Sequence, residues 1–323
     1  MNIKSYFSYQ LLLAAFLVAA FSNLTQAQVL QVSGANTPPF TPQNLISNIF
    51  LGEGVTVTNI SYNGTNSAVG YFTGGTQAVG IERGIVMTTG VATTNGTALG
   101  SDEQGVDFSS HDNASTATDA SLAALATAGL NDVAIYSITF IPTADTLRFR
   151  YCFGSEEYPE FACSSFNDVF GFFISGPNPA GGNYNNLNIA KVPGTGLAVA
   201  INTVHPANPI YNCAALNVQY YNNNNGSQLQ PVYDGFTDVF TAEAVVTPCQ
   251  QYTIKLAIAD VSDGIYDSGV FLEAKSFGTG SLQVELSTRS LDGTVTEGCT
   301  DGMLTFKLPT PTQSAFPIDY NVW

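Results

Sequence analysis

Three aspartates lie close together in the stretch IKLAIADVSDGIYDSGVFLEA, which begins at Ile254. Asp260, Asp263 and Asp267 separate two apolar runs, in a chain where only 11% of the residues are charged. Carboxylates held around one loop repel each other unless a cation joins them, and calcium takes about six to eight oxygen ligands. The pattern therefore indicates a calcium site. Turn chemistry explains it equally well, because aspartate side chains also bond to their own backbone in turns.

A second acidic stretch, YCFGSEEYPEFACSSFNDVFGFFISGP, supports the calcium hypothesis. Glu156 and Glu157 are neighbours, so on an extended strand they point to opposite faces. We expect one of them to share a site with Asp260 or Asp263 and the other to stay solvated. For Asp168, a turn at the start of a strand is the alternative. The candidate calcium ligands are Glu156, Glu157, Asp168, Asp260, Asp263 and Asp267.

Enzymatic chemistry has weaker support in the sequence. Two carboxylates such as Glu157 and Asp263 would suit a polysaccharide hydrolase if their carboxyl groups lay about 5 to 9.5 Å apart. Ser110, His111 and Asp112 are consecutive, and adjacent side chains do not build a nucleophilic relay. No catalytic residue is therefore assigned, and we expect a protein that is not an enzyme.

The first 27 residues predict export. Lys4 precedes the apolar run LLLAAFLVAAF, and TQA ends at Ala27, which is the layout of a cleaved signal peptide. The alternative, a membrane anchor, needs about 20 apolar residues. We expect a secreted protein without a transmembrane segment. The net charge of −16 repels phosphate backbones, so nucleic acid is not an expected partner.

Five cysteines in an exported chain predict disulfides. Cys152, Cys163, Cys213 and Cys249 are the candidates, and they can pair in three ways. A bridge from Cys152 to Cys163 would close a short loop, but pairing across strands is equally plausible. Cys299 is then left over.

Short β-branched or aromatic runs dominate residues 55–277, with Gly, Pro, Asn and Asp between them. This predicts a mostly β fold, a jelly-roll-like antiparallel β-sandwich over residues 28–280. One or two short helices are expected, at TPQNLISNIFLG and at TDASLAALATAG, while YYNNNNGSQ reads as an exposed loop. The predicted strands are VTVTNISY, GIVMTT, AIYSITFI, TLRFRYCF, DVFGFFIS, LAVAINTV, YTIKLAIA and GVFLEAKSF.

A boundary is expected near FGTGS, at residues 277–281. The runs LQVELS, TVTEG and MLTFKL after it resemble the first strands of a second sandwich. An immunoglobulin-type sandwich needs roughly 100 residues, so residues 281–323 are interpreted as its incomplete start and the chain as part of a longer protein. The alternative is a strand pair that packs back on the first domain.

Several motifs, in order, resemble the choice-of-anchor L domain. They are GIVMTTG, FGSEEYPEF, FNDVFGFFISGP, IAKVPGTG, INTV and YTIKLAIADVSDGIYDSGVFLEAKSF. The match covers roughly residues 45–278, and the segment TVTEGCTDGMLTFKLPTPT resembles the start of a Calx-β-like or immunoglobulin-like repeat. The resemblance implies an extracellular module of large surface proteins, notably of gliding Bacteroidota that use type IX secretion.

Together these observations predict a non-enzymatic adhesion or interaction module at the cell surface, stabilised by calcium. Its partner would be a surface glycan or protein, and other subunits of a surface assembly are further candidates. The alternative is a structural spacer whose aspartates only cap turns.

Overall fold

The computed structural model describes residues 30–35, 38–93, 112–224, 231, 233–280, 283–288 and 302–307. The expected signal peptide, His111 and Cys299 lie outside these residues. For 283–288 and 302–307 only the backbone is described.

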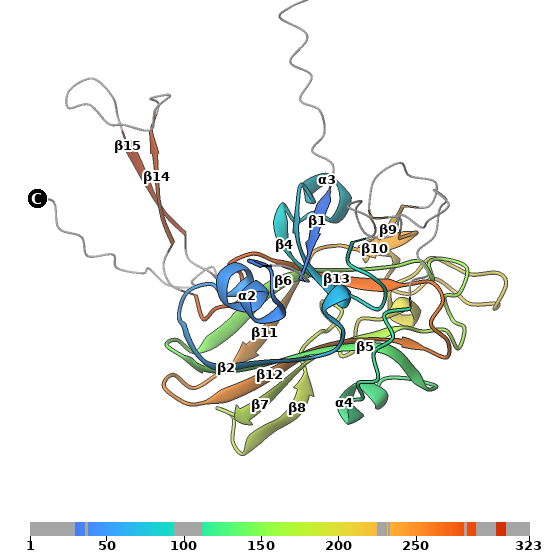
Figure 1. Ribbon diagram of the computed structural model, residues 1–323, viewed down its shortest axis with the longest axis horizontal. Coiled ribbons are helices and arrows are strands. Elements are labelled where there is room, and N and C mark those ends of the chain that lie inside the picture. The colour runs from blue at the N-terminus through green and yellow to red at the C-terminus, as the bar shows by residue number, and fades with distance from the viewer. Residues whose placement is uncertain are drawn as a thin grey trace, which may run out of the picture.

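Up to residue 280, the described chain forms two antiparallel sheets that face each other (Figure 1). The expected mostly β, sandwich-like fold is confirmed. The first sheet has the order β1 (Gln31–Gly34), β3 (Val69–Thr73), β4 (Arg83–Thr88), β13 (Ser268–Glu273), β6 (Thr146–Ser155), β10 (Gly235–Thr237) and β9 (Tyr221–Asn223), with β11 (Phe240–Val245) also paired to β6. The second has the order β2 (Val55–Asn63), β5 (Leu130–Pro142), β12 (Tyr252–Val261), β7 (Val169–Pro177) and β8 (Asn183–Asn188).

Strand periodicity decides which side chains enter the main core. In β12, Ile254, Leu256 and Ile258 belong to the largest cluster of buried apolar residues, whereas Ala257 and Ala259 belong to a separate cluster. Successive side chains of a strand point to opposite faces. One face of β12 therefore packs in the main core, and the other packs against the segment around Leu122.

The first helical segment begins where the sequence predicts it. The hydroxyl oxygen of Thr41 accepts a hydrogen bond from Asn44 N, at 3.3 Å, and Pro42 occupies the first position of α2 (Pro42–Asn44). The chain then continues as a π-helix, η1 (Leu45–Phe50), which buries Leu45, Ile46 and Phe50. The other short helices are η2 (Asn66–Ala68), α3 (Thr76–Val79), η3 (Ile201–Thr203) and η4 (Val218–Tyr220).

The second predicted helix is real but short, α4 (Ala120–Ala123). The Asp119 carboxylate caps it by accepting hydrogen bonds from Ser121 N and Leu122 N, both at 2.9 Å, and also pairs with Lys255 of β12. We expect Asp119→Ala to lower the free energy of unfolding by about 1 kcal/mol, the usual effect of losing an N-cap. Chemical denaturation measures it.

Asp119→Asn is the matched control, because an asparagine oxygen still caps the helix while the ion pair with Lys255 is lost. Its effect is expected to be smaller than that of alanine. Equal losses in both variants would mean that the ion pair, not the cap, stabilises this helix.

One predicted strand is wrong, and one predicted loop is wrong over three of its residues. LAVAINTV, residues 197–204, forms isolated bridges and the turn η3 rather than a strand. Val199, Ile201 and Val204 are buried in the main core, so the run has the composition of a strand without its hydrogen-bond ladder. Within YYNNNNGSQ, residues 221–223 form β9 and pair with β10, and residues 225–230 are outside the described part.

Backbone pairing with the first sandwich continues as far as Gly278. Phe277 forms a bridge to Leu51, and Gly278 forms one to Arg148. Beyond it, β14 (Gln283–Thr288) and β15 (Gly302–Lys307) pair antiparallel in a sheet of their own. That LQVELS and MLTFKL begin a second sandwich stays a prediction.

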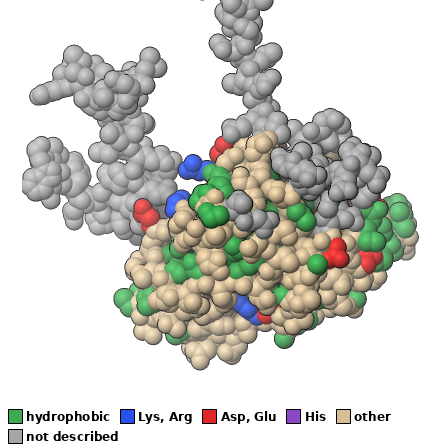
Figure 2. Space-filling model, in the orientation of Figure 1, with side chains coloured by type: hydrophobic (Ala, Val, Ile, Leu, Met, Phe, Trp, Pro, Cys, Tyr) green, Lys and Arg blue, Asp and Glu red, His purple; other side chains and the backbone are tan. Residues whose placement is uncertain are grey.

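Charged side chains are sparse on the face seen in Figure 2, which is mostly uncharged polar groups and backbone. This agrees with a composition in which only 11% of residues are charged. In the described residues, no helix has the length and apolar character to span a bilayer.

Candidate metal centre

Acidic side chains gather where strands of the two sheets end together. Glu156 and Glu157 follow the last residue of β6, and Asp168 precedes β7. Asp260 lies near the end of β12, and Asp267 precedes β13. Because β6 and β13 belong to the first sheet and β7 and β12 to the second, these carboxylates lie at one end of the sandwich and come from both of its layers.

Strand alternation directs two of them between the sheets. Asp260 follows the core residues Leu256 and Ile258 at intervals of two, and Asp168 precedes the core residue Phe170 by two. Both aspartates are 1% exposed. The period that fills the core with apolar side chains therefore also places two carboxylates at its end.

Asp168 joins the two acidic segments. Its Oδ1 accepts a hydrogen bond from Val261 N at 3.0 Å, and its Oδ2 accepts one from Ser268 Oγ at 2.6 Å. Burial raises the pKa of Asp168 to about 7, although these two hydrogen bonds lower it in part. The segments around residues 156–168 and 260–268, which are distant in the sequence, are thus in direct contact.

Asp260 is the least satisfied of these carboxylates. Within the described residues, neither of its oxygens has a hydrogen-bond partner of good geometry, although the Thr89 hydroxyl lies near enough to lower its pKa slightly. Burial first, and then the charges of Asp168 and Asp267, raise the pKa of Asp260 well above its ordinary value. A buried carboxylate without partners is costly, so this position calls for a proton or a cation.

The two neighbouring glutamates are both buried, at 1% and 2% exposure, so the expectation that one stays solvated is wrong. The chain turns after Ser155, whose Oγ accepts a hydrogen bond from Glu157 N at 2.9 Å. Burial and the charge on Asp168 raise the pKa of Glu157 to about 10. Glu156 instead lies near Tyr233, because its charge helps to raise the pKa of that phenol. They therefore border different parts of the cluster.

Asp267 is 1% exposed and packs against the backbone of Gly90. A Cβ atom on Gly90 would lie 1.9 Å from Asp267 Oδ2, so only glycine leaves room for this carboxylate. The glycine ends the GIVMTTG motif, and sequence analysis gave no reason for it.

Asp263 is only partly buried, and its Oδ1 accepts a hydrogen bond from Ile265 N at 3.4 Å. This is the aspartate turn contact that the sequence offered as the alternative. Its charge still contributes to the raised pKa of Glu157. Asp263 thus lies at the solvent-facing edge of the cluster.

Asp132 is a further member that sequence analysis missed. Its charge raises the pKa of Asp260, and its own pKa is raised to about 7, mainly by burial and then by contact with Asp112. The pairing of β5 with β12 shifts register next to it, and Asp132 has a φ of 52°. Nothing in NDVAIYSITF signals this irregularity, because it depends on the partner strand.

These carboxylates are close but not assembled as metal ligands. Among the described residues, the one trio of His, Cys, Asp or Glu whose ligand atoms all lie within 4.8 Å of one another is Cys163, His205 and Cys213. Binding of calcium, with oxygens at about 2.3–2.6 Å from the ion, would therefore require the acidic side chains to move closer together.

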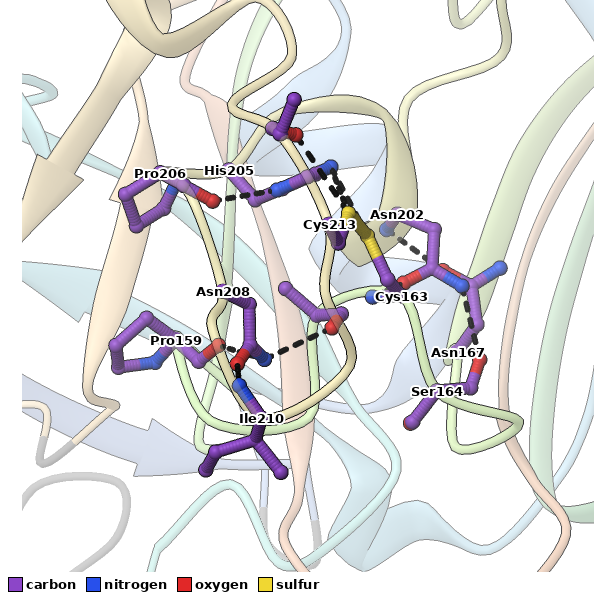
Figure 3. The surroundings of a disulfide bond; sticks show 12 residues. Pro159, Cys163, Ser164, Asn167, Asn202, His205, Pro206, Asn208, Ile210 and Cys213 are labelled. Carbon is purple, nitrogen blue, oxygen red and sulfur yellow. Dashed lines mark hydrogen bonds between the residues drawn. A yellow bond between two sulfur atoms is a disulfide. The ribbon is translucent and has the colours of Figure 1, made fainter.

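The cysteines pair differently from the short loop considered above. Cys163 forms a disulfide with Cys213 (Figure 3), while Cys152 and Cys249 are free thiols. A bridge from Cys152 to Cys163 is wrong, because Cys152 points away from the main core into a cluster with Phe271 and its Sγ contacts Thr237 O at 3.2 Å.

The raised pKa values predict a pH dependence in the presence of a chelator. The folded chain keeps protons on Asp168 that the unfolded chain releases above about pH 4. The free energy of unfolding therefore falls as pH rises, by about 1.4 kcal/mol per unit for one such group, until the folded pKa near 7 is passed. We expect an unfolding midpoint about 5–10 °C lower at pH 8 than at pH 5. Asp168→Asn should reduce this difference in midpoint. The same difference in the variant and in the unchanged chain would contradict the role of Asp168.

Comparison with known proteins agrees with the sequence motifs. No curated protein and no solved structure matches the chain. The model of the choice-of-anchor L domain matches residues 33–278, which is more than half of the chain and includes every member of the acidic cluster. This family is not a known enzyme family. The protein belongs to the choice-of-anchor L domain family.

Proposed function

We propose that this protein is a non-enzymatic interaction module at the cell surface whose acidic cluster binds calcium. Family membership suggests a surface-associated, extracellular module. The observation that carries the calcium proposal is Asp260, a fully buried carboxylate for which the described residues provide no hydrogen-bond partner of good geometry. Asp168, Asp267 and Asp132 lie near enough for their charges to raise its pKa.

The chemistry of the donors favours calcium over softer metals. The candidate ligands are all carboxylates. Calcium prefers such oxygen donors and tolerates irregular geometry, whereas zinc and copper prefer nitrogen and sulfur. A divalent cation would also offset the repulsion that otherwise keeps protons on these groups.

Calcium would act on the loops at this end of the sandwich. The ion would connect the end of β12 and the start of β7 with the start of β13, which lies in the other sheet. Between Asp260 and Asp267 the chain exposes Ile265, at 49%. Ordering of this loop would create a binding surface that depends on calcium, for a surface glycan or another protein. We also propose that the module projects from the cell surface.

Thermal unfolding of the full chain tests the proposal, in millimolar calcium and then in excess chelator at pH 7. A site filled at a hundred times its dissociation constant adds about 2.7 kcal/mol to the free energy of unfolding. For a domain of this size the midpoint should rise by about 5–10 °C. Magnesium at the same concentration should raise it less, because magnesium demands near-octahedral geometry.

An equal rise with magnesium would point to general screening of negative charge rather than to a site. No rise with either ion would contradict the calcium proposal. The aspartates would then act in turns and the module as a structural spacer.

A further inference from the structure

The trio Cys163, His205 and Cys213 is held in place by contacts other than the disulfide. His205 and Leu216 exchange backbone hydrogen bonds at 2.9 and 3.1 Å, and Asn208 and Cys213 exchange two at 2.9 Å. These four bonds form a small hairpin that carries both His205 and Cys213. The relative position of the two ligand residues therefore does not depend on the S–S bond.

The loop of Cys163 is fixed to the same hairpin. The side-chain amide of Asn208 lies 2.8 Å from Glu160 O and 2.9 Å from Ala162 O. The Asn202 side chain accepts a hydrogen bond from Cys163 N and donates one to Ser164 O (Figure 3). Cys163 is thus held toward His205 by the backbone on both of its sides.

The orientation of His205 points to a ligand. The ring is 1% exposed, and its Nδ1 lies 2.7 Å from Pro206 O. A carbonyl only accepts, so Nδ1 carries a hydrogen, and in the neutral ring Nε2 presents a lone pair. Nε2 faces the sulfurs of Cys163 and Cys213, at 3.6 and 3.9 Å (Figure 3).

A disulfide has no hydrogen to donate to this lone pair. If the two cysteines were thiols, one S–H could donate a hydrogen bond to Nε2. If they were thiolates bound to a cation, the Nε2 lone pair would bind the cation as its third ligand. Metal-binding histidines commonly have this arrangement, with the second ring nitrogen bonded to a backbone carbonyl. His205 therefore matches the reduced or metal-bound form of the two cysteines better than the oxidised form.

We propose that the reduced chain binds one zinc ion through Cys163, Cys213 and His205. Two thiolates and an imidazole are donors that zinc prefers, and a fourth position remains for water. Two thiolate charges neutralise Zn²⁺, which suits a partly buried site. This site is separate from the acidic cluster, whose donors are oxygens.

Zinc and the disulfide are alternative states of the same pair. A dithiol reductant transfers two electrons and two protons to Cys163 and Cys213, and is itself oxidised to a disulfide. Zinc binding then releases these two protons and leaves both sulfurs as thiolates. Bound zinc slows oxidation of the pair, because each thiolate shares a lone pair with the metal and is a weaker nucleophile than the free thiolate.

The test uses the full chain, reduced with a phosphine and freed of metals, and titrated with Co²⁺ as a coloured substitute for zinc. One Co²⁺ per chain should bind with a thiolate-to-metal charge-transfer band, and one equivalent of Zn²⁺ should remove the band. The oxidised chain should bind none. Zinc should also raise the unfolding midpoint of the reduced chain.

Three variants locate the site. Cys213→Ser should abolish the band, and His205→Gln, which keeps both sulfurs, should weaken zinc binding at least tenfold. Cys249→Ser, the same exchange at an exposed free thiol, should change nothing. Failure of the reduced chain to bind Co²⁺ would overturn the proposal. So would binding that survives both Cys213→Ser and His205→Gln, or zinc binding that leaves the unfolding midpoint unchanged.

Discussion

Replacing Phe277 by alanine is expected to lower the free energy of unfolding by about 3–5 kcal/mol, as for other buried phenylalanines. The ring is fully buried and contacts Phe50, Phe140 and Phe149, with ring centroids 5.2–5.6 Å apart. Phe140 belongs to β5 of one sheet and Phe149 to β6 of the other. Phe277 therefore fills the space between the two layers, and its removal leaves a cavity that rigid strands on both sides cannot close.

Urea denaturation measures this loss, with Leu187→Ala as control because Leu187 is 47% exposed. The control should change the free energy of unfolding by less than about 0.5 kcal/mol. A loss below about 1 kcal/mol for Phe277→Ala would mean that the first domain ends before Phe277. A loss of about 3–5 kcal/mol would place the domain boundary after Phe277, as the FGTGS stretch predicts.

The burial of several candidate ligands follows from the sequence, because side chains along a strand alternate between the core and the opposite face. Asp168 and Asp260 continue the inward alternation of β7 and β12, so their burial follows from the same pattern that defines the core. The hydrogen bond from Ser268 to Asp168 also follows this pattern. Ser268 precedes the core residues Val270 and Leu272 of β13 at intervals of two, so its side chain points inward as theirs do. That the carboxylates share one calcium ion stays a prediction.

Other parts of the site depend on contacts that no local pattern encodes. Asp132 joins the cluster because β5 shifts register against β12. Gly90 is required by the carboxylate of Asp267, which is far from it in the sequence. The disulfide partner of Cys163 lies 50 residues away, in a segment without regular strands. Long-range packing decides each of these.

The calcium proposal makes its sharpest prediction at Asp260. In chelator at pH 7, Asp260→Asn should hardly change the unfolding midpoint, because burial and neighbouring charges already favour the protonated, uncharged form of this side chain. In calcium, the same variant should lose the whole rise of about 5–10 °C seen for the unchanged chain. Thermal unfolding of both chains under both conditions measures the four midpoints.

The matched control is Asp145→Asn, the same exchange at an exposed aspartate between β5 and β6, at the end of those strands away from the cluster. It removes one negative charge and should keep the calcium response. A structural role for Asp260 alone predicts the opposite pattern, with a lower midpoint in chelator and an unchanged calcium response. A calcium response retained in Asp260→Asn but lost in Asp145→Asn would move the ion away from the cluster. Loss only at Asp260 would assign the ion to the buried carboxylate that the sandwich leaves without a partner of good geometry among its described residues.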